Sequence, residues 1–166
     1  MPRLLTALDT AETVVLCTPL YVDGLPAQVV RFLEYAQRHA SWANKKVYVL
    51  ANMGLYESKQ LINLFSAVRQ WCGKMNMDYC GGLGVSAGEL IGALIPYAPS
   101  RLVPAGKIME GIGKLAEAIR QGVKTGDIYT EPFCFPRSLY ITIANTNWNR
   151  TAKKNGITPE DLYRRL

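Results

Sequence analysis

The chain has 166 residues, of which 49% are hydrophobic and 19% are charged, and it carries a formal net charge of +6. This length and composition indicate a single domain over residues 1–166 with an ordinary buried core, and they argue against two domains. No apolar run reaches the roughly eighteen residues of a membrane-spanning helix, and the first residues lack a signal peptide's apolar region, so we expect a cytoplasmic protein.

Short strands and helices alternate in the first half of the chain. Residues 13–18 (TVVLCT) form an apolar, β-branched run without alternation, which is typical of a parallel strand covered on both faces. A turn-like segment follows, and Pro26 suits the first turn of a helix whose apolar positions recur at three- and four-residue steps. Residues 46–51 (KVYVLA) are predicted to form the second strand.

The clearest helix follows the loop after this second strand, with Ser58 as its expected cap. Its apolar stripe comprises Leu61, Leu64, Phe65, Val68, Cys72 and Met75. Residues 79–85 (YCGGLGV) are predicted to form a third strand. A β-α-β-α-β series requires crossover connections, so it predicts an α/β fold with a parallel sheet.

The second half of the chain is less regular. Three prolines predict a loop with at most short helical pieces over 86–105. A helix is predicted over 106–124. Its inward-facing residues are expected to be Ile108, Ile112, Leu115, Ile119 and Val123.

Residues 135–156 fit two periodicities. The alternation that favours a strand involves Leu139, Ile141 and Ile143, and the repeat that favours a helix involves Tyr140, Ala144 and Trp148. The length of the segment favours a helix. Thr158, Pro159 and Asp161 suit the cap and first turn of a last short helix at 158–164, so we expect residues 136–166 to form a helical carboxyl-terminal extension.

The first strand needs a neighbour. Leu4, Leu5 and Leu8 before it fit the last turns of a helix, so the chain opens mid-helix and we interpret it as amino-terminally truncated. A strand that is apolar on both faces normally lies inside a sheet, because an exposed edge presents unpaired backbone groups. We therefore expect 13–18 to pair with another strand of this chain, a second copy or a separately encoded segment.

The loop after the first strand is the strongest candidate for a ligand site. In open α/β sheets, ligands bind outside the carboxyl ends of the strands, so this loop would meet a flat cofactor. Pro19 stiffens the turn, Tyr21 offers an aromatic surface, and Gly24 lets backbone amides approach a ring edge. On composition alone, an ordinary turn between a strand and a helix explains these residues equally well.

Several segments resemble one known family. Residues 18–36 (TPLYVDGLPAQVVRFLEYA) resemble the flavin loop and following helix of flavodoxin-like NAD(P)H-dependent FMN reductases. Residues 52–57 (NMGLYE) resemble the family's next loop, which contacts the isoalloxazine ring. Residues 84–90 (GVSAGEL) and 135–156 (FPRSLYITIANTNWNRTAKKNG) also resemble that family.

The resemblance implies a flavodoxin-like three-layer sandwich. Its parallel sheet would have five strands in the order 2-1-3-4-5, of which this chain supplies strands three to five. The implied FMN contacts are Thr18, Pro19, Leu20, Tyr21, Val22, Asp23 and Gly24 in the first loop, and Asn52, Met53, Gly54, Leu55 and Tyr56 in the second. No side chain is assigned a catalytic role, since hydride transfer itself needs none.

This chain departs from the family pattern at the flavin phosphate. The resemblance places that phosphate in a Ser/Thr-rich loop after strand one, and no strand-loop-helix unit precedes Thr18. Losing two or three charge-assisted hydrogen bonds of about 1.5–3 kcal/mol each would weaken a nanomolar site to roughly micromolar or beyond. We therefore expect the ring contacts to survive while tight retention of FMN fails.

Three functional interpretations remain open. The family function implies electron transfer from NAD(P)H through FMN to an acceptor such as a quinone or another flavin. The second is a non-catalytic remnant that does not retain FMN and pairs through its open sheet edge. In the third, an earlier in-frame start restores the missing strand. The resemblance also implies a dimer or tetramer.

Two other patterns are given structural interpretations. Residues 82–87 match G-x-G-x-x-A, but the glycines fall within the predicted strand, so we expect them to allow close packing instead. Asp23, Glu57 and Glu89 are loop acids with no nucleophile or histidine nearby in sequence, so we expect them to be solvated.

The cysteines and the basic tail residues suit structural and surface roles. The cysteines are Cys17, Cys72, Cys80 and Cys134. They lack metal-ligand spacing, so we interpret them as reduced structural thiols, with a redox role left open at Cys17. The basic tail residues are Arg150, Lys153, Lys154, Arg164 and Arg165. They suit a solvated surface that could attract pyridine nucleotides, and no nucleic-acid-binding module accompanies them.

Overall fold

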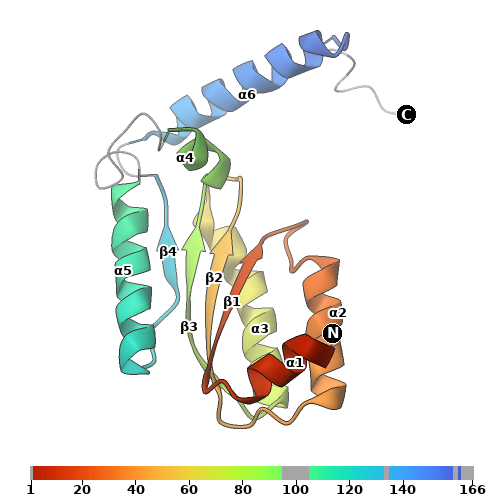
Figure 1. The fold of residues 1–166 in the computed structure, drawn as a ribbon. Helices are drawn as coiled ribbons and strands as arrows, with labels where there is room; N and C mark the ends of the chain where they lie inside the picture. Colours follow the sequence, from red (N-terminus) through yellow and green to blue (C-terminus); the bar gives the residue numbers. More distant parts are fainter. Residues whose placement is uncertain (1, 95–104, 133–134, 159–160, 162–166) are drawn as a thin grey trace. The chain divides into compact units, whose positions relative to one another are not determined.

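The computed structural model describes residues 2–94, 105–132, 135–158 and 161 (Figure 1). The chain divides into two compact units, Met1–Phe133 and Cys134–Leu166. In the first unit, the strands are β1 (Thr13–Pro19), β2 (Lys46–Asn52), β3 (Asp78–Val85) and β4 (Ile128–Thr130). The helices of that unit are α1 (Pro2–Asp9), α2 (Ala27–His39), the 3-10 helix η1 (Ser58–Leu61), α3 (Ile62–Lys74), α4 (Gly88–Leu94) and α5 (Gly106–Gln121).

The predicted α/β class and the three predicted strands are confirmed. The described strands form one sheet in the order β1-β2-β3-β4, and every neighbouring pair is parallel. The sequence did not indicate β4, because three residues are too short to show an alternation.

Helices lie on both faces of the sheet, which gives the three layers of an α/β sandwich (Figure 1). Along β2, Val47 and Val49 pack into the same core cluster as α2 and α3. Tyr48, between them, packs into a second cluster with Leu115 of α5. This division follows from the strand itself, because successive side chains point to opposite faces.

The prediction that the first strand is covered on both faces is wrong. Val14 and Leu16 of β1 pack against the core cluster of α2 and α3, whereas Val15 is 42% exposed and Cys17 is exposed. The helix on that side, α5, contacts β3 and β4. Since β1 is also an edge of the sheet, its Val15 face is left without a helix in the described part of the chain.

The glycines of β3 allow helix α3 and its lead-in to approach the sheet closely. A Cβ atom at Gly82 would lie 3.0 Å from the Phe65 ring, and one at Gly84 would lie 2.8 Å from Leu61 Cδ1. The contact at Gly84 is shorter than real Cβ contacts, and the contact at Gly82 is tighter than most of them. The close-packing interpretation of 82–87 is therefore confirmed, and these glycines lie within a strand, not in a phosphate-binding turn.

Helix α5 approaches the other face through small residues. Ile108 and Leu115 are buried as predicted, but Ile112 is 38% exposed, and Val123, beyond the helix, is also exposed. Gly111 faces the sheet instead, where an added Cβ would lie 2.8 Å from Leu83 Cδ1. A pattern search for large apolar residues passes over such a contact.

The stripe predicted for the central helix is confirmed, and its start is corrected. The six residues of the stripe, Leu61, Leu64, Phe65, Val68, Cys72 and Met75, are all buried. The expected cap at Ser58 is wrong, because Ser58 is the first residue of η1 and Glu57 holds the cap position without a side-chain cap bond. At the preceding helix, Pro26 holds the cap position directly before α2.

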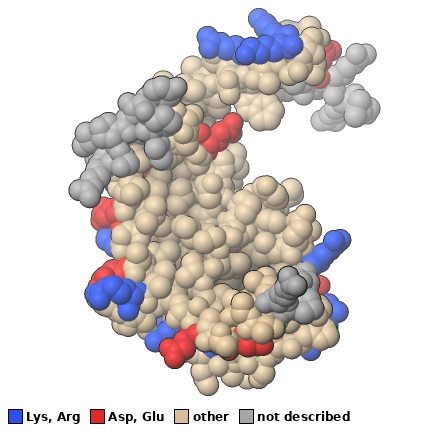
Figure 2. All heavy atoms as spheres, viewed as in Figure 1, with Lys and Arg blue, Asp and Glu red and all other residues tan. Residues whose placement is uncertain are grey.

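The second unit contains α6 (Arg137–Lys154), so the helical prediction for this segment is confirmed. Of its described side chains only Ala152 is buried, while Leu139, Ile143 and Trp148 are exposed. Lys and Arg side chains gather along one side of this helix (Figure 2). The predicted helix at 158–164 lies mostly outside the described residues, as do all three prolines of the predicted loop. Thr158 and Asp161 form the mutual hydrogen bonds of a cap.

A polar cluster fastens α3 to the segment that leads into β4. The Tyr79 hydroxyl donates to Asp127 Oδ1 at 2.6 Å, and Arg69 Nη2 forms an ion pair with Asp127 Oδ2 at 2.5 Å. The guanidinium of Arg69 also lies over the Tyr79 ring, 4.6 Å from its centroid. Burial, followed by the hydrogen bond to Asp127, raises the pKa of Tyr79, so this hydroxyl stays protonated and donating.

Removing the Tyr79 hydroxyl should weaken the fold measurably. We expect Tyr79→Phe to lower the free energy of unfolding by about 1.5–3 kcal/mol, because the lost hydrogen bond has a charged acceptor. Urea denaturation followed by circular dichroism measures this change. Tyr21→Phe is the matched control, because Tyr21 is 62% exposed, and it should change the unfolding free energy by less than about 0.5 kcal/mol. Equal effects of the two substitutions would contradict the role of the cluster.

Two of the cysteines are buried in the core, and their thiols should be unreactive in the folded protein. Burial, with a smaller contribution from Cys80, raises the pKa of the Cys72 thiol to about 12. A thiol whose pKa lies this far above neutral carries almost no thiolate at pH 8, and the thiolate is the reactive form.

In a Cys134→Ser background, we expect a thiol-specific reagent to modify only Cys17 rapidly at pH 8, because Cys17 is exposed and both Cys72 and Cys80 are buried. The buried thiols should react only on unfolding in urea. The number of thiols titrated before and after denaturant gives the result. Rapid reaction of two or more thiols in the native protein would contradict the burial of Cys72 and Cys80.

Candidate functional site

The candidate site is the carboxyl edge of the sheet, where the register of three strands brings three loops together. Pro19 is paired with Asn52, and Asn52 is paired with Val85, so β1, β2 and β3 end side by side. Ligands of open parallel sheets bind at this edge. The two loops that the sequence analysis singled out are therefore neighbours at one end of the molecule.

Backbone hydrogen bonds lace these loops to one another. Leu20 N–H donates to Asn52 O at 2.8 Å, which joins the first loop to the second. Met53 N–H donates to Val85 O at 3.0 Å, and Gly88 N–H donates to Met53 O at 2.9 Å, which joins the second loop to the third. These backbone bonds fix the positions of the three loops relative to one another.

The first loop closes in a tight turn over residues 21–24. Tyr21 and Gly24 each donate a backbone N–H to the other's carbonyl oxygen at 3.0 Å. The central residues, Val22 and Asp23, have φ values of 46° and 57°, as in a type I′ turn. A β-branched residue in this conformation is strained, and such outliers concentrate at ligand-binding loops. Val22 is fully exposed at the tip of the turn.

The predicted contact residues divide into two groups. Tyr21, Val22, Asp23, Gly54 and Leu55 have exposed side chains or, for glycine, an exposed backbone at the loop surface. The side chain of Met53 is 4% exposed and belongs to the core cluster of α2 and α3, against which Leu20 also packs.

Thr18 is also turned away from the loop surface. It is 5% exposed, and its hydroxyl donates to the neighbouring Pro19 carbonyl at 3.1 Å. Together with Met53, this residue packs beneath the loops, whereas the side chains of the first group are exposed at the loop surface.

The third loop contributes residues that the sequence analysis did not single out. An added Cβ at Gly88 would lie 2.1 Å from Asn52 Oδ1, so the Asn52 amide lies flat against the Gly88 backbone. Ala87 has a φ of 50°, and Ser86 Oγ is the buried side-chain oxygen that lacks a hydrogen-bond partner within the described residues. The run of small residues Ser86-Ala87-Gly88 is the sequence signal that could have indicated this contact, because a loop that packs this tightly requires small residues.

The acidic residues at this edge are exposed or half-buried. Asp23 and Glu89 are exposed and Glu57 is half-buried. Across the described part of the chain, no three His, Cys, Asp or Glu side chains lie close enough to hold a metal ion.

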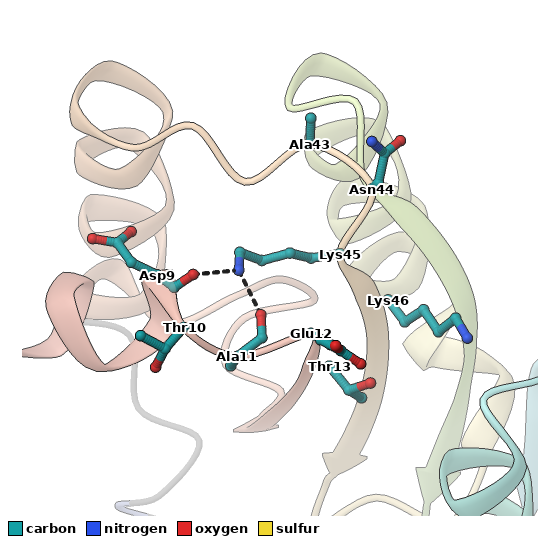
Figure 3. A pocket seen from close by; sticks show the side chains of 9 residues that line it. All are labelled: Asp9, Thr10, Ala11, Glu12, Thr13, Ala43, Asn44, Lys45 and Lys46. Atoms are coloured by element: carbon teal, nitrogen blue, oxygen red, sulfur yellow. Dashed lines mark hydrogen bonds between the residues drawn. The ribbon is translucent and has the colours of Figure 1, made fainter.

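A hollow of about 350 Å³ lies at the opposite end of the sheet, around the amino ends of β1 and β2 (Figure 3). Its central cation is Lys45, whose Nζ donates to the carbonyl oxygens of Asp9 at 2.9 Å and Ala11 at 2.5 Å. These bonds fasten the turn after α1 to the start of β2. The lysine is thus engaged with backbone, and this hollow is not where open α/β sheets bind ligands.

Comparisons with known proteins add little beyond the fold. No family model and no curated protein sequence matches the chain. Among solved structures, the chain is similar to the flavodoxin, WrbA-like protein from Agrobacterium tumefaciens, with 18% identity and a TM-score of 0.46 over 70% of this chain and 71% of that one. None of the helices in the described regions combines the length and hydropathy of a membrane span. The assignment to the α/β class therefore rests on the parallel sheet itself.

The contact between Gly88 and Asn52 can be tested by two glycine substitutions in the same helix. Gly88→Ala should displace the Asn52 amide and lower the free energy of unfolding by about 1–3 kcal/mol, as overpacking does. Gly92→Ala is the control, because nothing lies within 4 Å of an added Cβ there, and it should raise stability by about 0.5–1 kcal/mol through helix propensity. Urea unfolding of both variants measures the two changes. If Gly88→Ala also stabilised the protein, the close contact would be disproved.

Proposed function

We propose that this chain is a cytoplasmic, flavodoxin-like oxidoreductase that binds FMN at the carboxyl edge of its sheet. The observation that carries the proposal is the set of backbone hydrogen bonds that joins the three loops there, from Leu20 to Asn52 and from Met53 to Val85. This arrangement gives a flat ring a rigid backbone frame next to exposed side chains. The resemblance of residues 18–36 and 52–57 to the flavin loops of NAD(P)H-dependent FMN reductases supports the same conclusion.

The residues at this edge fit the ring of a flavin. Tyr21 and Leu55 are 62% and 50% exposed and offer an aromatic and an apolar surface from two different loops. The exposed Asn52 amide carries both donors and an acceptor, which suits the polar edge of an isoalloxazine. Its contact with Gly88 holds that amide in one place. We assign these side chains the orientation of the ring.

The residues before β1 do not fit the phosphate. Residues 2–12 form α1 and the turn that follows it, and so they do not provide the Ser/Thr-rich loop that the family places after a strand. For a ring held by these loops alone, we expect a dissociation constant on the order of micromolar or weaker.

When bound, FMN would supply the redox chemistry by accepting a hydride from NAD(P)H and passing electrons to an acceptor such as a quinone or another flavin. The protein's own part is to hold the ring and to keep one face open. None of Asp23, Glu57 and Glu89 is required for a proton transfer in this scheme.

A second candidate function is favoured by the position of β1 at an edge of the sheet. In that case, the chain is a non-catalytic flavodoxin-like protein that does not retain FMN and acts through association with another chain. The exposed edge strand β1 supports it.

Comparing FMN with riboflavin separates the two candidates. If the ring alone is held, the fluorescence of both FMN and riboflavin should be quenched on titration with the purified chain. Their two dissociation constants should agree within about tenfold, which corresponds to about 1.4 kcal/mol. Absence of binding for both at millimolar concentration would support the non-catalytic candidate. A preference for FMN of more than about a hundredfold would show that a phosphate site exists and would contradict our assignment.

The ring contact of Tyr21 is tested by Tyr21→Ala, which should weaken riboflavin binding by about two- to tenfold, the worth of one aromatic contact. Ile112→Ala is the control, because Ile112 is also an exposed hydrophobic side chain but lies on α5, away from the loops. This variant should leave riboflavin binding unchanged. If both variants bound riboflavin as the unmodified chain does, the ring would not lie on Tyr21.

A further inference from the structure

The open edge of β1 presents a defined set of backbone groups. Glu12 O accepts from Lys46 N–H at 3.0 Å, and Leu20 N–H donates to Asn52 O at 2.8 Å, so even-numbered positions of this segment turn toward β2. Backbone groups alternate along a strand, and the N–H and C=O of Thr13, Val15 and Cys17 therefore point away from β2. In the described residues, β1 is the end of the strand order, so no strand lies on that side.

Most of this edge lacks the features that protect exposed strands from pairing, and only the last residue of β1, Pro19, is a proline. Edge strands are usually guarded by a charged side chain, a proline or a bulge. Residues 13–18 contain neither a charge nor a proline, and the β1–β2 register runs without a shift from Thr13 to Pro19. The surface over β1 in Figure 2 is free of Lys, Arg, Asp and Glu side chains.

We propose that two copies of this chain pair through β1 as an antiparallel dimer with a two-fold axis at Val15. In that register Val15 faces Val15, and Thr13 faces Cys17 of the other copy. Every outward N–H of Thr13, Val15 and Cys17 then meets an outward C=O, as hydrogen-bonded antiparallel pairs require. A register centred on Cys17 would instead place Val15 opposite Pro19, which has no N–H to donate.

The side chains agree with this register. Val14 lies opposite Leu16 of the other copy on the face covered by α2 and α3, so apolar side chains meet there. On the other face, the exposed Val15 side chains become neighbours. Like charges do not face each other at any position, because 13–18 is uncharged.

The dimer is independent of the proposed flavin site. Antiparallel pairing sends the carboxyl ends of the two β1 strands in opposite directions, so the two sets of loops lie at opposite ends of the shared sheet. Association therefore leaves both carboxyl edges open. Losing the dimer and losing the flavin are separate outcomes.

Sedimentation equilibrium of the full chain over micromolar concentrations tests the proposal. We expect a species of twice the 18.4 kDa chain mass. Val15→Pro removes an outward N–H but no bond to β2, and prolines are tolerated on edge strands, so this variant should fold and dimerise at least tenfold more weakly. A monomer at all concentrations, as expected if a strand of a different polypeptide covers β1, would overturn the proposal.

Two lysine variants control for folding and for surface charge. Val15→Lys places like charges directly opposite each other at the two-fold axis and should also dimerise at least tenfold more weakly. Ile112→Lys adds the same charge to an exposed position of α5 and should leave the dimer intact. Circular dichroism confirms that each variant is folded. Equal dimerisation by folded Val15→Lys and the unmodified chain would refute pairing at this edge.

The register is tested by oxidation of Thr13→Cys, which places a thiol opposite Cys17 of the second copy. We expect this variant to give a covalent dimer on a non-reducing gel, and the unmodified chain to give much less. With Cys134→Ser in both chains, equally efficient crosslinking without Thr13→Cys would mean that Cys17 faces itself, and the axis at Val15 would be wrong.

Discussion

The parallel ladder through β1, β2 and β3 is the constraint on which the other features depend. Its register aligns Pro19, Asn52 and Val85 at one edge of the sheet. A parallel strand has to return to the same end before the next begins, so each loop at this edge leads into a helix that packs on a face. The same hydrogen bonds that hold the strands together thereby place three loops within bonding distance. The position of the candidate site therefore follows from the register of the sheet, and the loop residues supply its side chains.

Glycines allow the helices to pack closely against both faces of this sheet. Gly82 and Gly84 admit Phe65 and Leu61 on one face, and Gly111 brings α5 onto the other. A Cβ at any of these positions would push a layer outward and open a void, which costs packing energy in a core at native density. The tightness at Gly88 continues this principle into the third loop, where small residues let the chain pass against Asn52.

In the described residues, the two edges of the sheet are β4 and β1. The edge beyond β3 is extended by β4, which the Arg69, Tyr79 and Asp127 cluster helps to anchor. The edge at β1 has no charged side chain over residues 13–18, and its Val15 is 42% exposed. We propose that this edge pairs with a second copy and that the loops hold a flavin ring. The two features lie on different parts of the strand, so both can operate in one molecule.

The sequence by itself determined the class of fold, the three longer strands, the apolar stripe of α3 and the helical nature of 137–154, because hydrophobic periodicity records which positions meet the core. It also located the first two loops, since ligand edges follow from strand order. Only the tertiary structure decided that Thr18 and Met53 turn inward, that Gly111 replaces Ile112 at the sheet, and that Gly88 fixes Asn52. Those outcomes depend on distances between segments far apart in the chain, and a local pattern of residue types contains no information about such distances.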